Sequence, residues 1–427
     1  MRTRCDYALI LAPVLSLAGL AGCGVAEPPT DRSQLSRLVP AVDAAELSAA
    51  VDANTNFAID LHRKVVAPGR NVITSGYSIT SALSMLWGGS AGTTEIALAH
   101  ALGLPFAQAK MHPLLNRIES DLLSRNDTVG DFDRFELHVT NDLWAQLGFE
   151  ALPSYLDLLA TQYGAGVRRL DFAKKPEAAR QTINDWVAAE THNRIQDLLP
   201  EGSVTPDTVL ALTNAVYFKA KWQEAFDPAS TQPAAFTRDD ASTVQAPFMH
   251  RIGDLPSLKE DGLTAVELPY AGEELAMLVL MPADLAQLEA DLSAEKIAGI
   301  VARLHLQSTA VALPKWQHAL TLNLKPLLTE LGAGELFDPS TANLSGIDGK
   351  RDLFVQAAVH KAFVLVDESG TEAAAATGIT VGRLSAEFPE LDVRFDHPFV
   401  YLLRDRRTGT VVFMGRVVDP TSPAASN

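Results

Sequence analysis

The stretch that decides the fold is Val366-Asp-Glu-Ser-Gly-Thr-Glu-Ala-Ala-Ala-Ala-Thr-Gly-Ile379. An acidic strand end passes through Gly370 into four alanines, and no charge occurs from Ala373 to Gly382. In a strand, side chains alternate between two faces, and here both faces carry mainly small residues. Such a strand could slide between two others without steric hindrance. An isolated alanine run favours a helix instead, since alanine is the best helix former, so the context must decide.

Shorter motifs occur in a fixed order along the rest of the chain. They include Asn56-Phe57-Ala58, Ala82-Leu83-Ser84-Met85-Leu86, Thr213-Asn214-Ala215-Val216-Tyr217-Phe218-Lys219, Val266-Glu267-Leu268-Pro269-Tyr270, Leu313-Pro314-Lys315-Trp316, Asp396-His397-Pro398-Phe399 and Val412-Phe413-Met414-Gly415-Arg416-Val417. With the alanine stretch, their order and spacing resemble the serpins, protease inhibitors whose reactive loop inserts into a β-sheet. The resemblance covers about residues 50 to 420. It implies an α+β serpin fold with three β-sheets, eight or nine helices and an exposed reactive loop.

The periodicity of apolar residues agrees with this fold class. Helical spacing predicts helices at 52–65, 78–86, 93–102, 153–163 and 176–190. Strand patterns occur at 136–145, 209–218, 264–268, 276–281, 309–313, 354–366, 399–404 and 411–417. Helices cluster early and strands late, as in an α+β domain.

The N-terminus predicts export and a lipid anchor. Arg2 and Arg4 precede an apolar run that ends in Leu20-Ala21-Gly22-Cys23. This is the pattern of a secretory signal, and the run is shorter than the ~20 residues that span a membrane. The last four residues resemble the lipobox of bacterial lipoproteins, which implies that Cys23 carries lipid. A plain secretory signal with a chance cysteine is the alternative.

The predicted domain plan follows from this start. It has a signal peptide (1–22), a lipidated start with a flexible tether (23–45), one domain (46–420) and a tail (421–427). No aspartate follows Cys23, so we expect a place in the cell envelope, at the outer membrane or the cell surface. The other cysteine, Cys5, leaves with the signal, and no disulfide remains.

The composition is that of a globular protein, with 47% hydrophobic and 20% charged residues and a net charge of −17. The acidity argues against nucleic acid or heparin-like partners and leaves membrane attachment to the lipid. We expect no cofactor, because no phosphate-binding glycine loop occurs, and no metal, because the ten histidines lack ligand spacing. A monomer is expected.

Two short motifs raise the alternative of an enzyme. Gly88-Gly89-Ser90-Ala91-Gly92 matches the nucleophile elbow of hydrolases, but that elbow needs a strand before the serine, and both flanks here have helical patterns. Ser293-Ala-Glu-Lys296 matches the Ser-x-x-Lys of β-lactamases, but no Lys-Thr-Gly follows. We therefore expect a protein that is not an enzyme.

The resemblance implies inhibition as a suicide substrate, in which serine proteases attack the loop and are trapped as covalent acyl complexes. The hinge that folds into the sheet would consist of Glu368, Gly370, Thr371, Glu372, Ala373, Ala374, Ala375, Ala376 and Thr377. The family's count from the hinge glycine places the cleaved bond between Leu384 and Ser385. A leucine fits the apolar pocket of chymotrypsin-like, elastase-like or subtilisin-like proteases. Cleavage after Arg383 would indicate a trypsin-like target.

A polar cluster is expected to control the opening of the sheet. Ser78, Asn214 and His360 match the family's cluster beneath the main sheet, and Trp222 matches a tryptophan near the place where the loop inserts. The alternative for His360 is an ordinary hydrogen-bonded core histidine. The family commonly has Ser-Pro where this chain has Ser75-Gly76, and the added backbone freedom puts the tightness of the cluster in doubt.

Two classes of function follow. The first is a serine protease inhibitor, which the uncharged hinge favours. The second is a serpin-fold protein that is only a cleavable substrate or a binding module.

Overall fold

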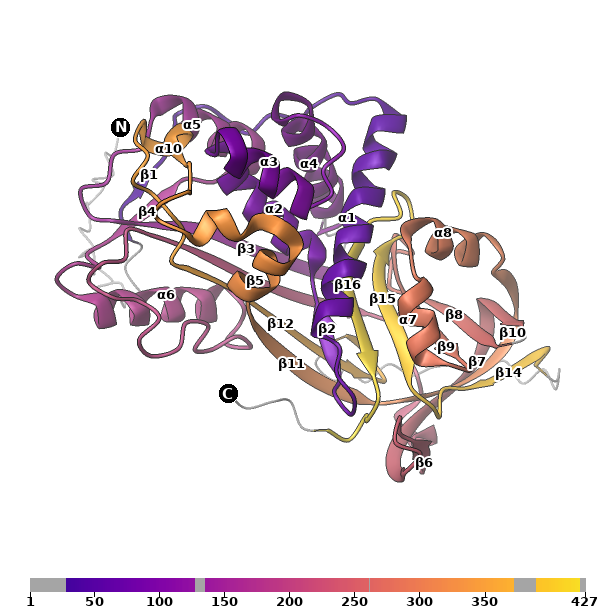
Figure 1. Ribbon diagram of the computed structural model, residues 1–427. Helices are drawn as coiled ribbons and strands as arrows, with labels where there is room; N and C mark the ends of the chain where they lie inside the picture. Colours follow the sequence, from indigo (N-terminus) through magenta and orange to yellow (C-terminus); the bar gives the residue numbers. More distant parts are fainter. Residues whose placement is uncertain (1–27, 127–134, 261, 372–388, 423–427) are drawn as a thin grey trace, which may run out of the picture.

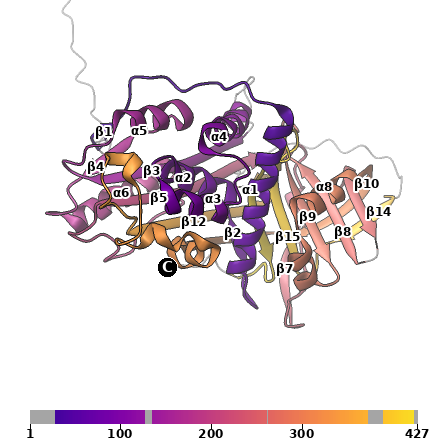
Figure 2. The ribbon, with the colours of Figure 1, turned by 45° about the horizontal axis from the view of Figure 1, so that its top comes forward.

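The structure, a computed structural model, describes residues 28–126, 135–260, 262–371 and 389–422. Two large β-sheets are joined in one body, with helices α1 to α5 gathered on one side of the first sheet (Figures 1 and 2). The architecture is α+β, as expected. No helix in the described part of the chain is long and apolar enough to cross a membrane.

The described residues form ten α-helices, two of which are single turns. They are α1 (Ala44–Val65), α2 (Gly76–Gly88), α3 (Gly92–Ala101), α4 (Gln108–Leu123), α5 (Pro153–Leu158), α6 (Pro176–Glu190), α7 (Leu285–Asp291), α8 (Ala294–Ala302), α9 (Leu324–Leu328) and α10 (Ser345–Asp348). The π-helical turn Leu159–Tyr163 continues α5, so the helix predicted at 153–163 is present in two parts.

In the described part of the chain, the first sheet has seven strands. In spatial order they are β1 (Thr30–Asp31), β4 (Val167–Leu170), β3 (Phe135–Gln146), β5 (Leu210–Lys221), β13 (Gly370–Thr371), β12 (Ala357–Asp367) and β11 (Trp316–Asn323). Strand β13 lies between β5 and β12 in this sheet. It comes directly before the alanine stretch in the sequence.

The second sheet has nine strands among the residues that the structure describes. Their order is β14 (Leu391–Arg394), β10 (His305–Pro314), β7 (Thr243–Glu260), β8 (Leu263–Pro269), β9 (Leu275–Pro282), β15 (Phe399–Asp405), β16 (Val411–Val417) and β2 (Val72–Thr74), and β6 (Gln232–Thr237) pairs with β7. The long strand β7 pairs with both β10 and β8. It thereby joins strands that would otherwise form two sheets.

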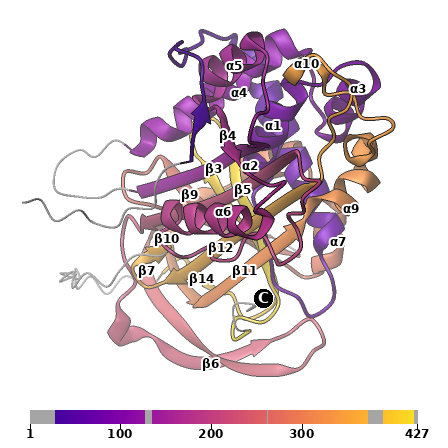
Figure 3. The same cartoon turned by 90° about the vertical axis from the view of Figure 1, so that its left-hand side faces the viewer.

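The two faces of the first sheet carry different covers. Helix α2 packs on one face and is buried on nearly every side. Helix α6 crosses the other face (Figure 3), where Ile183 and Trp186 pack with Trp144 of β3, Ala215 of β5 and Val359 of β12.

The described part of the segment that the sequence assigned to a tether contacts the folded body. Thr30 and Asp31 form a strand that pairs with β4. Farther on, Arg37 forms an ion pair with Glu119 of α4 at 2.9 Å, and the Leu38 N–H donates to the Thr161 carbonyl at 2.8 Å. This segment therefore belongs to the folded body, because its backbone and side chains find partners there.

Candidate functional site

The centre of the first sheet is split at one end by a short strand. Strands β5 and β12 pair directly, in parallel, between Ala211–Val216 and Ala357–Ala362. Beyond this point β13 lies between them and is antiparallel to both. Gly370 and Thr371 therefore occupy the first positions of an additional central strand.

A tight turn leads from β12 into β13. The Asp367 carboxylate accepts hydrogen bonds from the backbone N–H groups of Ser369 (2.8 Å) and Gly370 (3.2 Å). Gly370 has φ 153°, and a Cβ here would collide with the carbonyl oxygen of Ala220. Glycine is thus required by the close approach of β13 to β5.

Thr371 is held in a buried pocket at the insertion point. It is 1% exposed, and its hydroxyl lies 2.7 Å from the Tyr270 hydroxyl. Trp222 stacks on Tyr270 with ring centroids 4.6 Å apart and donates from Nε1 to the Asp367 carbonyl at 2.9 Å. The sequence predicted that Trp222 lies near this point. It predicted no role for Tyr270, although Tyr270 ends one of the motifs that carry the family resemblance.

Glu368 closes the turn from the other side. Its carboxylate pairs with Lys315 at 2.7 Å and accepts a hydrogen bond from the Thr231 hydroxyl at 2.7 Å. Burial alone would raise the pKa of Glu368, but these two hydrogen bonds outweigh it and lower that pKa. The carboxylate thus stays charged and ties the turn to two other segments. Lys315 and Thr231 had no predicted role.

Ser78, Asn214 and His360 come together beneath the directly paired part of β5 and β12. The Asn214 amide donates to the Ser78 hydroxyl (2.6 Å) and carbonyl (2.8 Å), and its Oδ1 bonds Nδ1 of His360. Nε2 of His360 accepts from the Ser75 N–H at 3.2 Å, so the ring proton lies on Nδ1, which donates to Asn214. Burial lowers the pKa of His360 to about 3, which keeps the ring neutral.

The polar cluster has members that the sequence did not indicate. Asn141 of β3 accepts a hydrogen bond from the Asn214 amide. Ser75 caps α2 by accepting from the Ser78 N–H at 3.1 Å and donates to the Val412 carbonyl at 2.7 Å. At Gly76, a Cβ would overlap Ala58 of α1. In this position glycine permits close helix packing, which is a different consequence from the backbone freedom considered above.

Several predicted residues lie outside the described residues. They are Glu372 to Thr377 of the hinge, Arg383, Leu384 and Ser385 of the loop, and Cys23. The two serines of the enzyme motifs are described. Ser90 lies between α2 and α3, is 6% exposed and donates to the Trp87 carbonyl at 2.7 Å. Ser293 caps α8 by accepting from the Lys296 N–H at 3.0 Å. Neither is arranged as a nucleophile.

Comparison with known proteins defines the class. The family model of the serpins, serine protease inhibitors, matches residues 52–420. The chain is 35% identical over 375 residues to an uncharacterized serpin-like protein of Thermococcus kodakarensis, covering 87% of this chain and 85% of that protein. It is 34% identical over 381 residues to the leukocyte elastase inhibitor of Bos taurus, covering 86% and 98%. The chain therefore belongs to the serpin family, whose members are protease inhibitors rather than enzymes.

The fold agrees with this assignment. The native-state crystal structure of a thermophilic serpin, tengpin, superposes with a TM-score of 0.80 at 22% identity, covering 92% of this chain and 100% of that one. The predicted serpin fold is confirmed. Serpins target serine proteases, and many relatives of this chain carry that function.

Proposed function

We propose that this serpin inhibits serine proteases as a suicide substrate, cleaved after Leu384 and inserting its hinge between β5 and β12. The observation that carries the proposal is β13, which already occupies the first positions of such a strand with the required antiparallel direction. A native state that is kinetically held short of its most stable form supplies the driving energy.

The strand register supports this path. Thr371 pairs with Ala220 on β5 and with Val366 on β12. A strand that continues in this register brings Thr377 opposite Asn214 on one side and His360 on the other. Those two residues are themselves paired across β5 and β12, so insertion must break their hydrogen bond. The Thr377 hydroxyl can then replace the lost partner.

The hinge residues suit the space that they would enter. In the same register Ala373 and Ala375 fall on the face of Thr371, which is buried at 1% exposure. Alanine adds little volume there, and no charge has to be desolvated. The leucine at the proposed cleavage position favours chymotrypsin-like, elastase-like or subtilisin-like targets.

The test is incubation of residues 24–427 with chymotrypsin, followed by denaturing electrophoresis and mass spectrometry. We expect a complex that survives denaturation and a released peptide that begins at Ser385. A peptide that begins at Leu384 would indicate cleavage after Arg383 and a trypsin-like target. Cleavage without a stable complex, repeated with elastase, trypsin and subtilisin, would mean that the protein is only a substrate.

We also propose that the mature protein is anchored in the cell envelope by lipid on Cys23. The support is the lipobox-like sequence Leu20-Ala21-Gly22-Cys23 behind an apolar run. Labelling with radioactive palmitate should mark the wild-type protein and leave Cys23→Ser unmarked. Equal labelling of both would contradict this anchor.

A further inference from the structure

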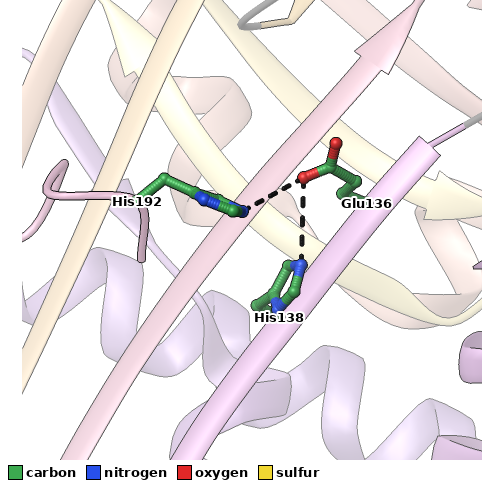
Figure 4. Close-up of side chains that lie close together, drawn as sticks. All are labelled: Glu136, His138 and His192. Atoms are coloured by element: carbon green, nitrogen blue, oxygen red, sulfur yellow. Dashed lines mark ion pairs between the residues drawn. The ribbon is translucent and has the colours of Figure 1, made fainter. Parts of the chain in front are cut away.

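Three side chains with metal-binding chemistry converge on the face of the first sheet that α6 covers. Glu136 and His138 are two residues apart on β3 and so share a face, and His192 reaches them from the segment after α6 (Figure 4). Glu136 Oε2 lies 3.3 Å from His192 Nε2 and 3.9 Å from His138 Nε2. The ligand atoms all lie within 4.8 Å of one another.

These separations are close to those of a bound zinc ion. Zn²⁺ binds histidine nitrogen and carboxylate oxygen at about 2.0–2.2 Å in a tetrahedral arrangement, which places ligand atoms roughly 3.3–3.5 Å apart. The pair of Glu136 and His192 already has this spacing, and the 3.9 Å between Glu136 and His138 exceeds it by about 0.5 Å. The 3.9 Å between Glu136 and His138 is too long for a hydrogen bond, so no direct hydrogen bond holds His138 to the carboxylate.

The surroundings orient the carboxylate and leave room for an ion to enter. Lys219 of β5 binds the other carboxylate oxygen of Glu136, Oε1, at 2.9 Å, so that Oε2 is turned to the imidazoles. Outer contacts of this kind fix the geometry of metal ligands. The side chains of His138 and His192 are 40% and 56% exposed. His192 has φ 49° and Asn193 φ 61°, a left-handed turn that directs the chain back over the sheet directly after α6.

We propose that Glu136, His138 and His192 form a binding site for Zn²⁺, with water completing the coordination. Two imidazoles and one carboxylate are a ligand set that zinc prefers. No metal constellation was expected from the sequence, where only the spacing of the histidines along the chain could be considered. His138 and His192 lie far apart in the sequence, and the fold brings their side chains together.

The site lies at one end of a strap, residues 192–196, that crosses the sheet. At its other end the Gln196 carbonyl accepts a hydrogen bond from Lys361 of β12 at 2.8 Å, and Arg194 lies over the ring of Phe363 at 5.9 Å. The strap thus runs from β3 to β12 above the place where β5 and β12 would separate. We infer that an ion at His192 fixes the strap and slows loop insertion, an inference that rests on the proposed function.

The binding test needs no protease. Isothermal titration of the full-length protein with ZnCl₂, after removal of metals by a chelator, should show one ion per chain at this site. His192→Ala should lose more than the roughly 10- to 100-fold in affinity that loss of an outer contact costs, and His138→Ala should do the same. His305→Ala, which removes an exposed histidine elsewhere, is the matched control and should bind like the wild type.

Protein stability and cobalt binding provide independent measurements. Without metal, all variants should unfold at the wild-type temperature, and Zn²⁺ should raise that temperature only where His138 and His192 are both present. Co²⁺ should give visible ligand-field bands that Glu136→Gln weakens. The site would be refuted if the wild type did not bind, or if both histidine variants bound like the wild type.

The coupling to inhibition is tested separately. Zn²⁺ should slow protease trapping by the wild type and leave trapping by His192→Ala unchanged. Equal rates in the wild type with and without bound Zn²⁺ would refute the coupling but leave the site established. A complete absence of trapping under every condition would refute the proposed function, whatever the titration shows.

Discussion

A single histidine gives the polar cluster its dependence on pH. His360 is neutral in the folded protein because burial lowers its pKa from an ordinary 6.5 to about 3. Between these values the unfolded chain binds one proton more than the folded chain, so protonation favours unfolding. The stabilising contribution is complete above pH 6.5 and is lost as the pH falls toward 3.

We therefore expect His360→Gln, which keeps a donor and an acceptor but does not titrate, to alter this dependence. As the pH falls from about 6 to 4, the wild type should lose stability relative to the variant by about 1.4 kcal/mol per pH unit. Urea unfolding at several pH values measures the difference between the two proteins. The contributions of the other buried histidines, His62, His112 and His318, are present in both proteins and cancel. Parallel curves for the two proteins would contradict the neutral, buried ring.

The second prediction at this scale concerns Thr371. Thr371→Arg would bury a guanidinium beside Tyr270 without a charge partner, at a cost of several kcal/mol. The protease should still cleave the loop, but the fraction trapped should fall sharply, as gel electrophoresis would show. Thr371→Val keeps the shape, loses only the hydrogen bond to Tyr270 and should retain most trapping. Equal trapping by the arginine variant and the wild type would exclude insertion that starts at Thr371.

At the scale of the element, β13 depends on the missing side chain of Gly370. We expect Gly370→Ala to push β13 away from β5, because the new Cβ meets the Ala220 carbonyl. The hydrogen bond from the Trp222 N–H to the Ser369 carbonyl, 2.9 Å long, should be lost. Removing about 1–3 kcal/mol of local stability should speed amide exchange at Trp222 by roughly 10-fold or more.

Hydrogen exchange with mass spectrometry of the segment around Trp222 measures this effect. The control is Gly409→Ala, in the turn between β15 and β16. Gly409 also has a positive φ of 81°, but a Cβ there meets open space. It should leave exchange at Trp222 unchanged. Unaltered exchange in Gly370→Ala would show that β13 does not need glycine.

The differences between the predicted and the observed elements show where local sequence patterns are insufficient. Helix α1 begins at Ala44 rather than residue 52, because the Asp43 carboxylate caps it by accepting from Ala45 and Glu46, ahead of the apolar periodicity. Helix α4 escaped prediction because it contains Pro113. Strand β7 contains two prolines, Pro247 and Pro256, which argue against a strand when only local sequence is considered.

The residues of the candidate sites also divide into those that the sequence predicted and those that only the structure revealed. Ser78, Asn214 and His360 were found because they lie within motifs that resemble the family. Asn141 and the proposed zinc ligands were not, since their meeting depends on the register between β3 and β5 and on the turn after α6. Tertiary placement of this kind leaves no periodic signal in a single sequence.

At the scale of the whole molecule, the proposed insertion of the loop as a strand between β5 and β12 would make the cleaved form more stable than the native state. Each ladder hydrogen bond is worth about 1 kcal/mol, so a complete central strand would add on the order of 10 kcal/mol. We expect the protein cleaved after Leu384 to unfold at a clearly higher temperature than the intact protein, as calorimetry would show. Cleaved Thr371→Arg should gain little, because its arginine bars the insertion. A cleaved wild type that melts like the intact protein would mean that the sheet does not accept the loop, and the trapping mechanism would lose its source of energy.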